Sequence, residues 1–222
     1  FCPNSPFIFM STNKVYGDNP NRLKFNENST RYDLNRNHKL FRGIDENFSI
    51  DDCTHSFFGV SKTYGDLIVQ EYGKNVGLKT VSFRGGCITG PNHSGAKLHG
   101  FLSYLVKCAK NNKIYNLIGY SGKQVRDNIH SHDLVNCFWE FFKKPKKGEV
   151  YNIGGGRFSN CSILEAISII EDKIKKKIKT NLIKKARVGD HQWYISNLKK
   201  FKSHYPEWKQ KYNIDKIIEE MI

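Results

Sequence analysis

The sequence predicts an α/β fold built on a mainly parallel sheet. Short apolar segments typical of buried strands alternate with longer segments of helical period along most of the chain. Strands that alternate with helices of this length are typical of units in which consecutive strands run parallel. An apolar fraction of 38% in 222 residues is enough to bury the core of such a fold.

The first half of the chain begins with a strand. Phe7-Ile8-Phe9-Met10 is a buried-strand pattern that leads into Ser11 to Gly17. Residues 22–52 are polar and irregular, so we expect a long excursion over the surface, of the kind that often forms a lid or an insertion. A helix, a second strand and a turn-rich segment are then expected at residues 56–72, 79–83 and 85–91.

The second half continues the alternation. Helices are expected at about residues 98–109 and 132–142, and strands or extended segments at residues 115–118, 125–130 and 150–153. Ser162 and Glu165 form a capping box, which predicts the start of a last helix that continues through Lys177.

Gly154-Gly155-Gly156 lies between a predicted strand and a predicted helix, where a phosphate-binding turn would occur. In such a turn the last glycine opens the helix, so that the phosphate meets the helix N-terminus. Here the helix signal begins several residues later, at Ser162, and the stretch that follows is rich in lysine. We therefore expect a tight structural turn.

The net charge of +15 would permit nucleic-acid binding, but the distribution of the charge disfavours it. Within the dense run from Lys173 to Lys185 and just before it, isoleucines recur at spacings of three and four, which places them on one helical face and the lysines in water. No aromatic residue that could stack on a base is interleaved with the run. We expect a solvated helix face and no nucleic-acid partner.

The sequence also disfavours a membrane or secreted protein and a protein with disulfides or a zinc site. No run approaches the ~20 apolar residues of a membrane helix, and no signal-peptide pattern is present, so we expect a cytoplasmic protein without a membrane partner. The six cysteines are scattered without a Cys-x-x-Cys pair or a zinc-type spacing. Reduced thiols and no metal site are expected.

Two separate blocks stand out in the first third of the sequence. The first is Ser11-Thr12-Asn13-Lys14-Val15-Tyr16-Gly17, and the second is Phe58-Gly59-Val60-Ser61-Lys62. Together they resemble the Ser/Thr and Tyr-x-x-x-Lys apparatus of the extended short-chain dehydrogenase/reductases. In that apparatus a hydroxyl polarises the reacting oxygen, and a lysine holds the nicotinamide ribose and lowers the pKa of a neighbouring phenol. Phe58 stands where that phenol would be expected, and a phenyl ring cannot titrate.

Several ordered blocks resemble the extended short-chain dehydrogenase/reductases of the NAD-dependent epimerase/dehydratase family, which act on nucleotide sugars, and in particular the CDP-paratose (tyvelose) 2-epimerase group. These blocks are residues 11–17, 55–62, 83–95, 122–130, 151–156 and 187–191. The resemblance implies an NAD-dependent isomerase that inverts C2 of a CDP-linked dideoxyhexose. Phe58 departs from the family pattern, so whether the chain is an active enzyme stays open.

The resemblance also implies roles for individual residues. Thr12 is similar to the hydroxyl of the catalytic triad, Phe58 occupies the tyrosine position, and Lys62 is similar to the ribose-binding lysine, with Ser11 beside it at the cofactor. For the substrate, Arg126 and Arg187 are similar to the arginines that grip the diphosphate, and the implied set of substrate-binding residues is Arg126, Arg187 and Asn92. A guanidinium suits this role because its two parallel N–H groups match phosphate oxygens.

The family's fold is a doubly wound, Rossmann-like sheet followed by a smaller α/β substrate domain. The resemblance assigns residues 1–90 to the C-terminal part of the NAD-binding domain, and residues 91–222 mainly to the substrate region, with residues 125–153 returning to the first. The half with the phosphate-binding glycines would lie upstream of Phe1, so we expect a fragment that needs the missing half to bind NAD. The complete protein is expected to form a homo-oligomer.

Alternatives remain at several positions. Tyr16, Tyr64, His55 and Cys87 are polar groups near the same blocks that could replace the missing phenol. Arg126 could form a structural ion pair with its neighbour Asp127 instead of binding substrate. A non-catalytic or truncated relative that binds nucleotide sugar is the main rival function, and a basic nucleic-acid-binding module is a weaker one.

Overall fold

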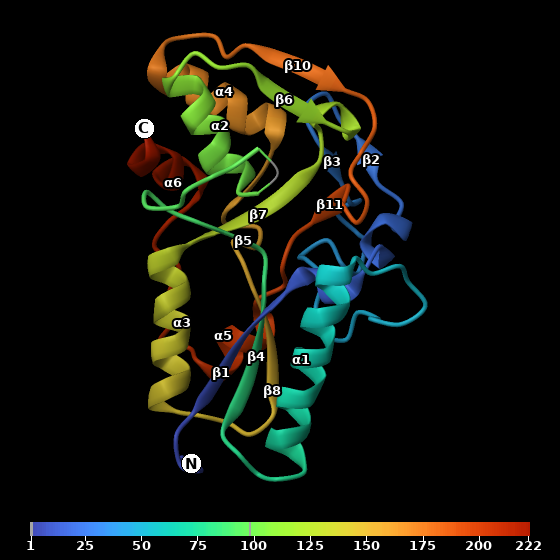
Figure 1. Ribbon diagram of the computed structural model, residues 1–222, viewed down its shortest axis with the longest axis vertical. Helices are drawn as coiled ribbons and strands as arrows, with labels where there is room; N and C mark the ends of the chain where they lie inside the picture. Colours follow the sequence, from blue (N-terminus) through green and yellow to red (C-terminus); the bar gives the residue numbers. More distant parts are fainter. Residues whose placement is uncertain (1, 98) are drawn as a thin grey trace.

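The computed structural model describes residues 2–97 and 99–222 and has the predicted α/β fold (Figure 1). Leu98, where the second helix was expected to begin, lies outside the described residues. The first sheet contains three parallel strands in the order β1 (Phe7–Thr12), β4 (Thr80–Gly85) and β8 (Glu149–Ile153). Every residue of the central strand β4 is buried, as expected for a parallel sheet covered on both faces.

Side chains along β4 alternate between the two faces of the first sheet, so different helices cover each face. Phe83 packs with the aromatic residues of α3 (Ser131–Lys143) and α5 (Lys199–His204). On the opposite face, Thr80 donates to the Val69 carbonyl of α1 (Phe57–Lys74), and Arg84 pairs with Asp66 of the same helix. Figure 1 shows α1 and α3 on opposite sides of this sheet. The first part of the fold is therefore wound on both faces.

A second group of strands continues from the first sheet. The parallel strands β5 (Cys87–Thr89), β7 (Val125–His130) and β11 (Trp193–Tyr194) lie in the order β11-β7-β5, and β9 (Asn160–Ser162) pairs antiparallel with β7. A two-stranded parallel sheet and a two-residue hairpin complete the strands: β6 (Tyr115–Ile118) with β10 (Thr180–Ile183), and β2 (Asn26–Glu27) with β3 (Tyr32–Asp33).

The remaining helices form a separate core. Buried residues of α2 (Phe101–Lys110), α4 (Ile163–Ile174) and α6 (Ile214–Met221) pack together beside β6. Three short 3₁₀ helices, η1 (Asn13–Tyr16), η2 (Asn19–Arg22) and η3 (Tyr120–Gly122), lie in connections. The assignment of residues 1–90 and 91–222 to two domains stays a prediction.

The last predicted helix was too long. The capping box of Ser162 and Glu165 is present at the start of α4, as the sequence predicts. The helix ends at Ile174, because Lys175 adopts a left-handed conformation with φ of 54°. Residues 180–183 then form the exposed strand β10, so the lysine run is not one helical face. Ile178 nevertheless packs on the same core as Ile174.

Two other expectations also need correction. The segment 22–52 does not merely cross the surface, because Leu34, Leu40 and Ile44 are buried in a core with Tyr16 and Trp193. The turn-rich segment 85–91 contains strand β5.

The glycine-rich turn is structural, as expected. A Cβ on Gly155 would lie 1.9 Å from the Ser159 carbonyl oxygen, and one on Gly154 would lie 2.1 Å from Asp127 Oδ2. Protein atoms therefore occupy the space that a phosphate would need.

Two features concern the chain as a whole. All six cysteines are free thiols. Within residues 2–97 and 99–222, no helix has the length and apolar character to cross a membrane.

Candidate functional site

The main cavity has a volume of about 890 Å³ and lies at the carboxyl ends of β1 and β4, where parallel sheets commonly bind ligands. Its lining comes from elements far apart in the sequence: the end of β1, the first turns of α1, strands β5 and β7, and the loops 92–100 and 187–190. All seven predicted site residues line the cavity: Ser11, Thr12, Phe58, Lys62, Asn92, Arg126 and Arg187.

The first wall of the cavity is formed by β1, η1 and α1. Thr12 ends β1, and its Oγ1 accepts a hydrogen bond of 3.3 Å from the Lys14 amide. Ser56 caps α1 by accepting from the Gly59 amide at 3.1 Å. Phe58 and Lys62 follow one turn apart, so both side chains lie on the same face of the helix. We call these residues, Thr12, Lys14, Phe58 and Lys62, the β1–α1 wall.

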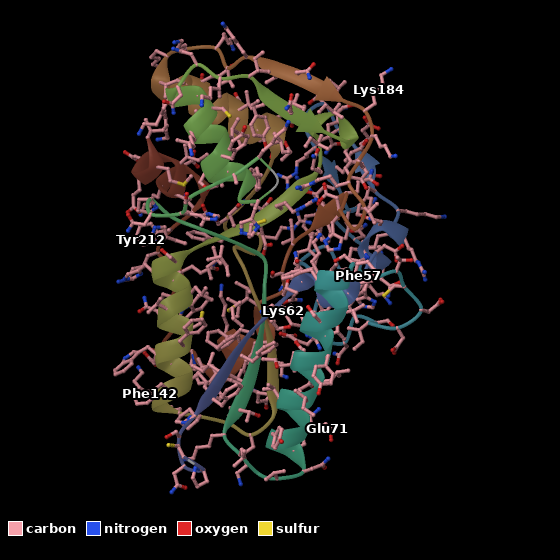
Figure 2. All side chains as sticks on the ribbon, in the orientation of Figure 1. Phe57, Lys62, Glu71, Phe142, Lys184 and Tyr212 are labelled. Carbon is pink, nitrogen blue, oxygen red and sulfur yellow. The ribbon has the colours of Figure 1, made fainter. Side chains whose placement is uncertain are left out.

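Lys62 reaches from α1 to the edge of β1 (Figure 2). Its Nζ donates a hydrogen bond of 2.9 Å to the Met10 carbonyl and lies 5.0 Å from the centre of the Phe9 ring. Phe7 donates its amide toward the β4 side, and strand alternation directs the Met10 carbonyl to the opposite edge. No strand among residues 2–97 and 99–222 pairs with that edge.

Phe58 lines the cavity and is 55% exposed. Of the four groups considered as replacements for the phenol, three do not line the cavity. Tyr16 is fully buried, donates to Asn152 Oδ1 at 2.8 Å, and has its pKa raised to about 12 by burial. Tyr64 is exposed, and His55 bonds to the Val15 carbonyl through Nε2. Cys87 lines the cavity, but burial raises the pKa of its thiol to about 11.

The opposite wall carries the two arginines. Arg126 is buried on β7, and its Nη2 lies 2.6 Å from Asp190 Oδ1 and also contacts the His191 carbonyl. Arg187 is half-exposed, and its Nη2 lies 3.8 Å from Asp190 Oδ2. Burial opposes the ionisation of Asp190, but the charges of Arg126, Lys14 and Arg187 lower its pKa overall. We call Arg126, Arg187 and Asp190 the arginine wall.

An ion pair between Arg126 and its neighbour Asp127 was the alternative to a substrate-binding role. That expectation was wrong, because Arg126 pairs with Asp190. Asp127 accepts hydrogen bonds from the amides of Gly156 at 3.0 Å and Ser196 at 2.9 Å. Its carboxyl is buried, and burial raises its pKa to about 6.

The two remaining predicted residues lie at different depths. Ser11 is buried, and within the described part of the chain its Oγ has no hydrogen-bond partner. Asn92 is exposed on the loop that follows β5, next to His93, whose ring stands 5.9 Å from that of His99. Both histidines also line the cavity.

Sequence reasoning missed Lys14 and Asp190 as residues of the cavity. Lys14 lies inside the block that contains Thr12, and Asp190 lies inside the block that contains Arg187, so position in a block was the available signal. No group of three or more metal-ligating side chains is found in residues 2–97 and 99–222.

The residues of the β1–α1 wall suit one part of a dinucleotide. An unpartnered Ser11 hydroxyl, the Thr12 hydroxyl and the Lys62 ammonium at a strand end could hold a ribose and its attached ring.

Several known proteins are similar to this chain in sequence or in fold. A sequence of 32% identity over 94% of this chain is the CDP-paratose 2-epimerase of Salmonella typhi, of which the chain covers 61%. Among solved structures, dTDP-glucose 4,6-dehydratase from Bacillus anthracis in complex with NAD matches with a TM-score of 0.75 and 23% identity, over 97% of this chain and 60% of that one.

A second solved structure also shares the fold. UDP-glucuronic acid 4-epimerase from Bacillus cereus was solved as a tyrosine-to-phenylalanine variant in complex with NAD and UDP-4-deoxy-4-fluoro-glucuronic acid. It matches with a TM-score of 0.71 and 23% identity, over 97% of this chain and 60% of that one. The chain thus spans about 60% of the length of each of these relatives. Their folds are those of NAD-dependent epimerases and dehydratases.

The family model for NAD dependent epimerases and dehydratases matches residues 2–154. This match covers more than half of the 222 residues and includes both the β1–α1 wall and Arg126. The chain belongs to the NAD dependent epimerase/dehydratase family.

Proposed function

We propose that this chain forms the catalytic and substrate-binding part of an NAD-dependent nucleotide-sugar epimerase. The observation that carries the proposal is that one cavity joins the β1–α1 wall to the arginine wall. The first wall supplies hydroxyls and amines suited to a carbinol and a ribose, and the second supplies two guanidinium groups suited to a diphosphate.

On this proposal, Arg126 and Arg187 bind the diphosphate of the substrate, and Asn92 contacts the nucleotide sugar at the cavity rim. Asp190 holds both arginines in place while leaving the pair of guanidiniums with a net positive charge. Thr12 donates to or accepts from the reacting sugar oxygen, and Ser11 with Lys62 binds the cofactor ribose. These roles are supported by the presence of all these residues in one lining.

When bound, NAD supplies the reversible removal of a hydride from the sugar carbon. The chain's own residues bind the diphosphate, orient the carbinol against Thr12 and exchange protons with its oxygen. The finer assignment to a CDP-linked dideoxyhexose with inversion at C2 is supported by the likeness to the Salmonella typhi protein. The chain covers about 60% of the length of these relatives, so NAD binding and self-association are proposed for the complete protein.

The test is binding and turnover by the complete protein. Calorimetry with CDP, UDP and dTDP should show tightest binding of CDP, and NMR should show the 2-epimer accumulating from CDP-paratose. Binding of none of the three nucleotides would contradict the assignment of the cavity, whereas binding of another nucleotide with turnover of its sugar would correct only the substrate.

Phe58 supports a second candidate, a relative that binds nucleotide sugar without converting it. A phenyl ring removes the phenol but preserves the shape of the cavity, so binding would survive. Tight nucleotide binding without epimerisation of any sugar offered would favour this candidate over the enzyme.

A further inference from the structure

Phe58 leaves the β1–α1 wall without a phenol, so on the proposed function another group must exchange the proton of the reacting hydroxyl. We propose that Lys14 performs this proton transfer, an inference that rests on the proposed epimerase function. Lys14 lines the cavity and lies on η1, two residues beyond Thr12.

The backbone of Lys14 is fixed against both other parts of the β1–α1 wall. Its amide donates to Thr12 Oγ1 at 3.3 Å, which ties it to the hydroxyl proposed to contact the substrate. Its carbonyl oxygen lies only 2.9 Å from the position that a Cβ on Gly59 would occupy, so the residue after Phe58 packs directly on Lys14. Lys14 therefore lies beside the first turn of α1.

The amine of Lys14 is held by a backbone carbonyl near the start of α1. Nζ donates a hydrogen bond of 2.8 Å to the Gly189 carbonyl. Gly189 in turn approaches the start of α1, since a Cβ on it would lie 3.6 Å from Ser56 Cβ. The amine thus contacts the loop that carries Arg187 and Asp190, and this loop approaches the first turn of α1, which carries Phe58.

The surroundings of Lys14 favour a neutral amine. Burial is the largest effect, and together with the positive charge of Arg126 it lowers the pKa of Lys14 to about 8. The charges of Asp190 and Cys87 raise the pKa of Lys14, whereas the charge of Arg187 lowers it further. His191, buried on the same loop, also interacts electrostatically with Lys14. An amine with a pKa near neutrality can serve as base and, once protonated, as acid.

Other titratable groups in the lining are less suited to the task. Asp190 is paired with Arg126 at 2.6 Å, and Lys62 is bound to the Met10 carbonyl. Tyr115 also lines the cavity, but burial raises the pKa of its phenol above the ordinary value, which keeps it protonated. Burial raises the pKa of the Cys87 thiol to about 11, which keeps it protonated. His93 and His99 contact each other on the loop before α2.

The proposed step balances in atoms and electrons. In the forward direction the O–H bond of the sugar carbinol breaks, and its proton forms a new N–H bond on the neutral Lys14 amine. The hydride of the same carbon passes to the oxidised nicotinamide, which leaves a carbonyl. In the return step the hydride would come back from the reduced nicotinamide to the other face of that carbon, and the Lys14 ammonium returns its proton to the oxygen, which re-forms the carbinol.

The first experiment measures Lys14 itself and needs no turnover. The chain is labelled with ¹³C,¹⁵N-lysine, and the Cε signals are followed by NMR from pH 6 to 11, with Lys14 assigned from the spectrum of Lys14→Arg. We expect a midpoint of about 8 for Lys14. A midpoint near the ordinary lysine value of about 10.4 would overturn the inference. Brief acetylation followed by peptide mass spectrometry gives the same midpoint without a variant.

The second experiment separates proton transfer from a merely structural role. In the complete protein, Lys14→Met should lower kcat by about 10²–10⁴-fold, and wild-type kcat/KM should rise with pH through about 8, because the neutral amine is the base. Adding Phe58→Tyr to Lys14→Met should restore much of the lost turnover by supplying a phenol. If Lys14 only holds the Gly189 loop in place, a phenol at position 58 cannot restore the lost turnover. A double variant as inactive as Lys14→Met would therefore overturn the inference.

Lys184→Met is the matched control, because Lys184 is exposed and points away from the molecule at the end of β10 (Figure 2). It should leave kcat unchanged. An active wild type with Lys14 titrating above about pH 10 would overturn the inference alone. A wild type that converts no nucleotide sugar, with Lys14 titrating near 8, would instead overturn the proposed function.

Discussion

The two walls of the cavity differ in how their charges are arranged. In the arginine wall, Arg126 and Arg187 share Asp190, so each charge has a partner before any ligand binds. In the β1–α1 wall, a phenyl ring occupies the position of a titratable phenol, and the amines of Lys14 and Lys62 are hydrogen-bonded only to backbone carbonyls among the contacts described. On the proposed function, binding and chemistry reside on different elements, which are coupled through the effect of Arg126 on the pKa of Lys14.

The largest effect is expected from breaking the arginine wall. Arg126→Met would leave the buried Asp190 carboxylate without its 2.6 Å partner, and such changes cost about 3–5 kcal/mol of unfolding free energy. Arg84→Met is the matched control, because it breaks a buried pair with Asp66 outside the main cavity. Urea unfolding should show similar losses in both variants, but calorimetry should show lost CDP binding only in Arg126→Met. Wild-type CDP affinity in Arg126→Met would show that this wall does not bind the diphosphate.

Asp127, the neighbour of Arg126 on β7, should make stability depend on pH. Its pKa in the folded chain is about 6, above the ordinary value, so the folded state binds more protons than the unfolded state between these values. Stability therefore falls as pH rises through this window, by up to about 3 kcal/mol. Asp127→Asn should flatten the change in unfolding free energy between pH 4 and pH 7. An unchanged pH dependence in the variant would refute the assignment.

Arg187→Gln tests the exposed side of the arginine wall. Hydrogen bonds to charged groups contribute about 1.5–3 kcal/mol, so CDP affinity should fall by about tenfold or more. Because Arg187 is half-exposed, the free energy of unfolding should change by less than about 0.5 kcal/mol. Arg42→Gln, an exposed arginine outside the cavity lining, is the control. Equal CDP affinities in the two variants would remove Arg187 from the site.

The β1–α1 wall was the more predictable of the two from sequence. Phe58 and Lys62 are four residues apart on a helix, so local geometry alone places them on one face. The start of α4 was equally predictable, because the two residues that cap it, Ser162 and Glu165, lie within one turn of each other. The end of α4 was not predictable from pattern, because Lys175 stops the helix by adopting a left-handed conformation that its residue type disfavours.

The arginine wall depends on contacts that a single sequence does not reveal. Arg126 and Asp190 are 64 residues apart and meet only after β7 and β11 have paired. The neighbouring residue Asp127 was the simpler partner to consider, and strand alternation explains why it was wrong, because adjacent side chains point to opposite faces. Lys14 was missed for a related reason: its role depends on Gly189, 175 residues away.

The most direct test of the account is the effect of Phe58→Tyr on turnover by the complete protein. If Lys14 already exchanges the proton, wild type converts CDP-paratose and Phe58→Tyr changes kcat by less than about tenfold, well below the 10²–10⁴-fold that a missing general acid-base group would cost. An inactive wild type that gains about 10²–10⁴-fold on Phe58→Tyr would contradict the account, because it would show that no other residue of the β1–α1 wall replaces the phenol.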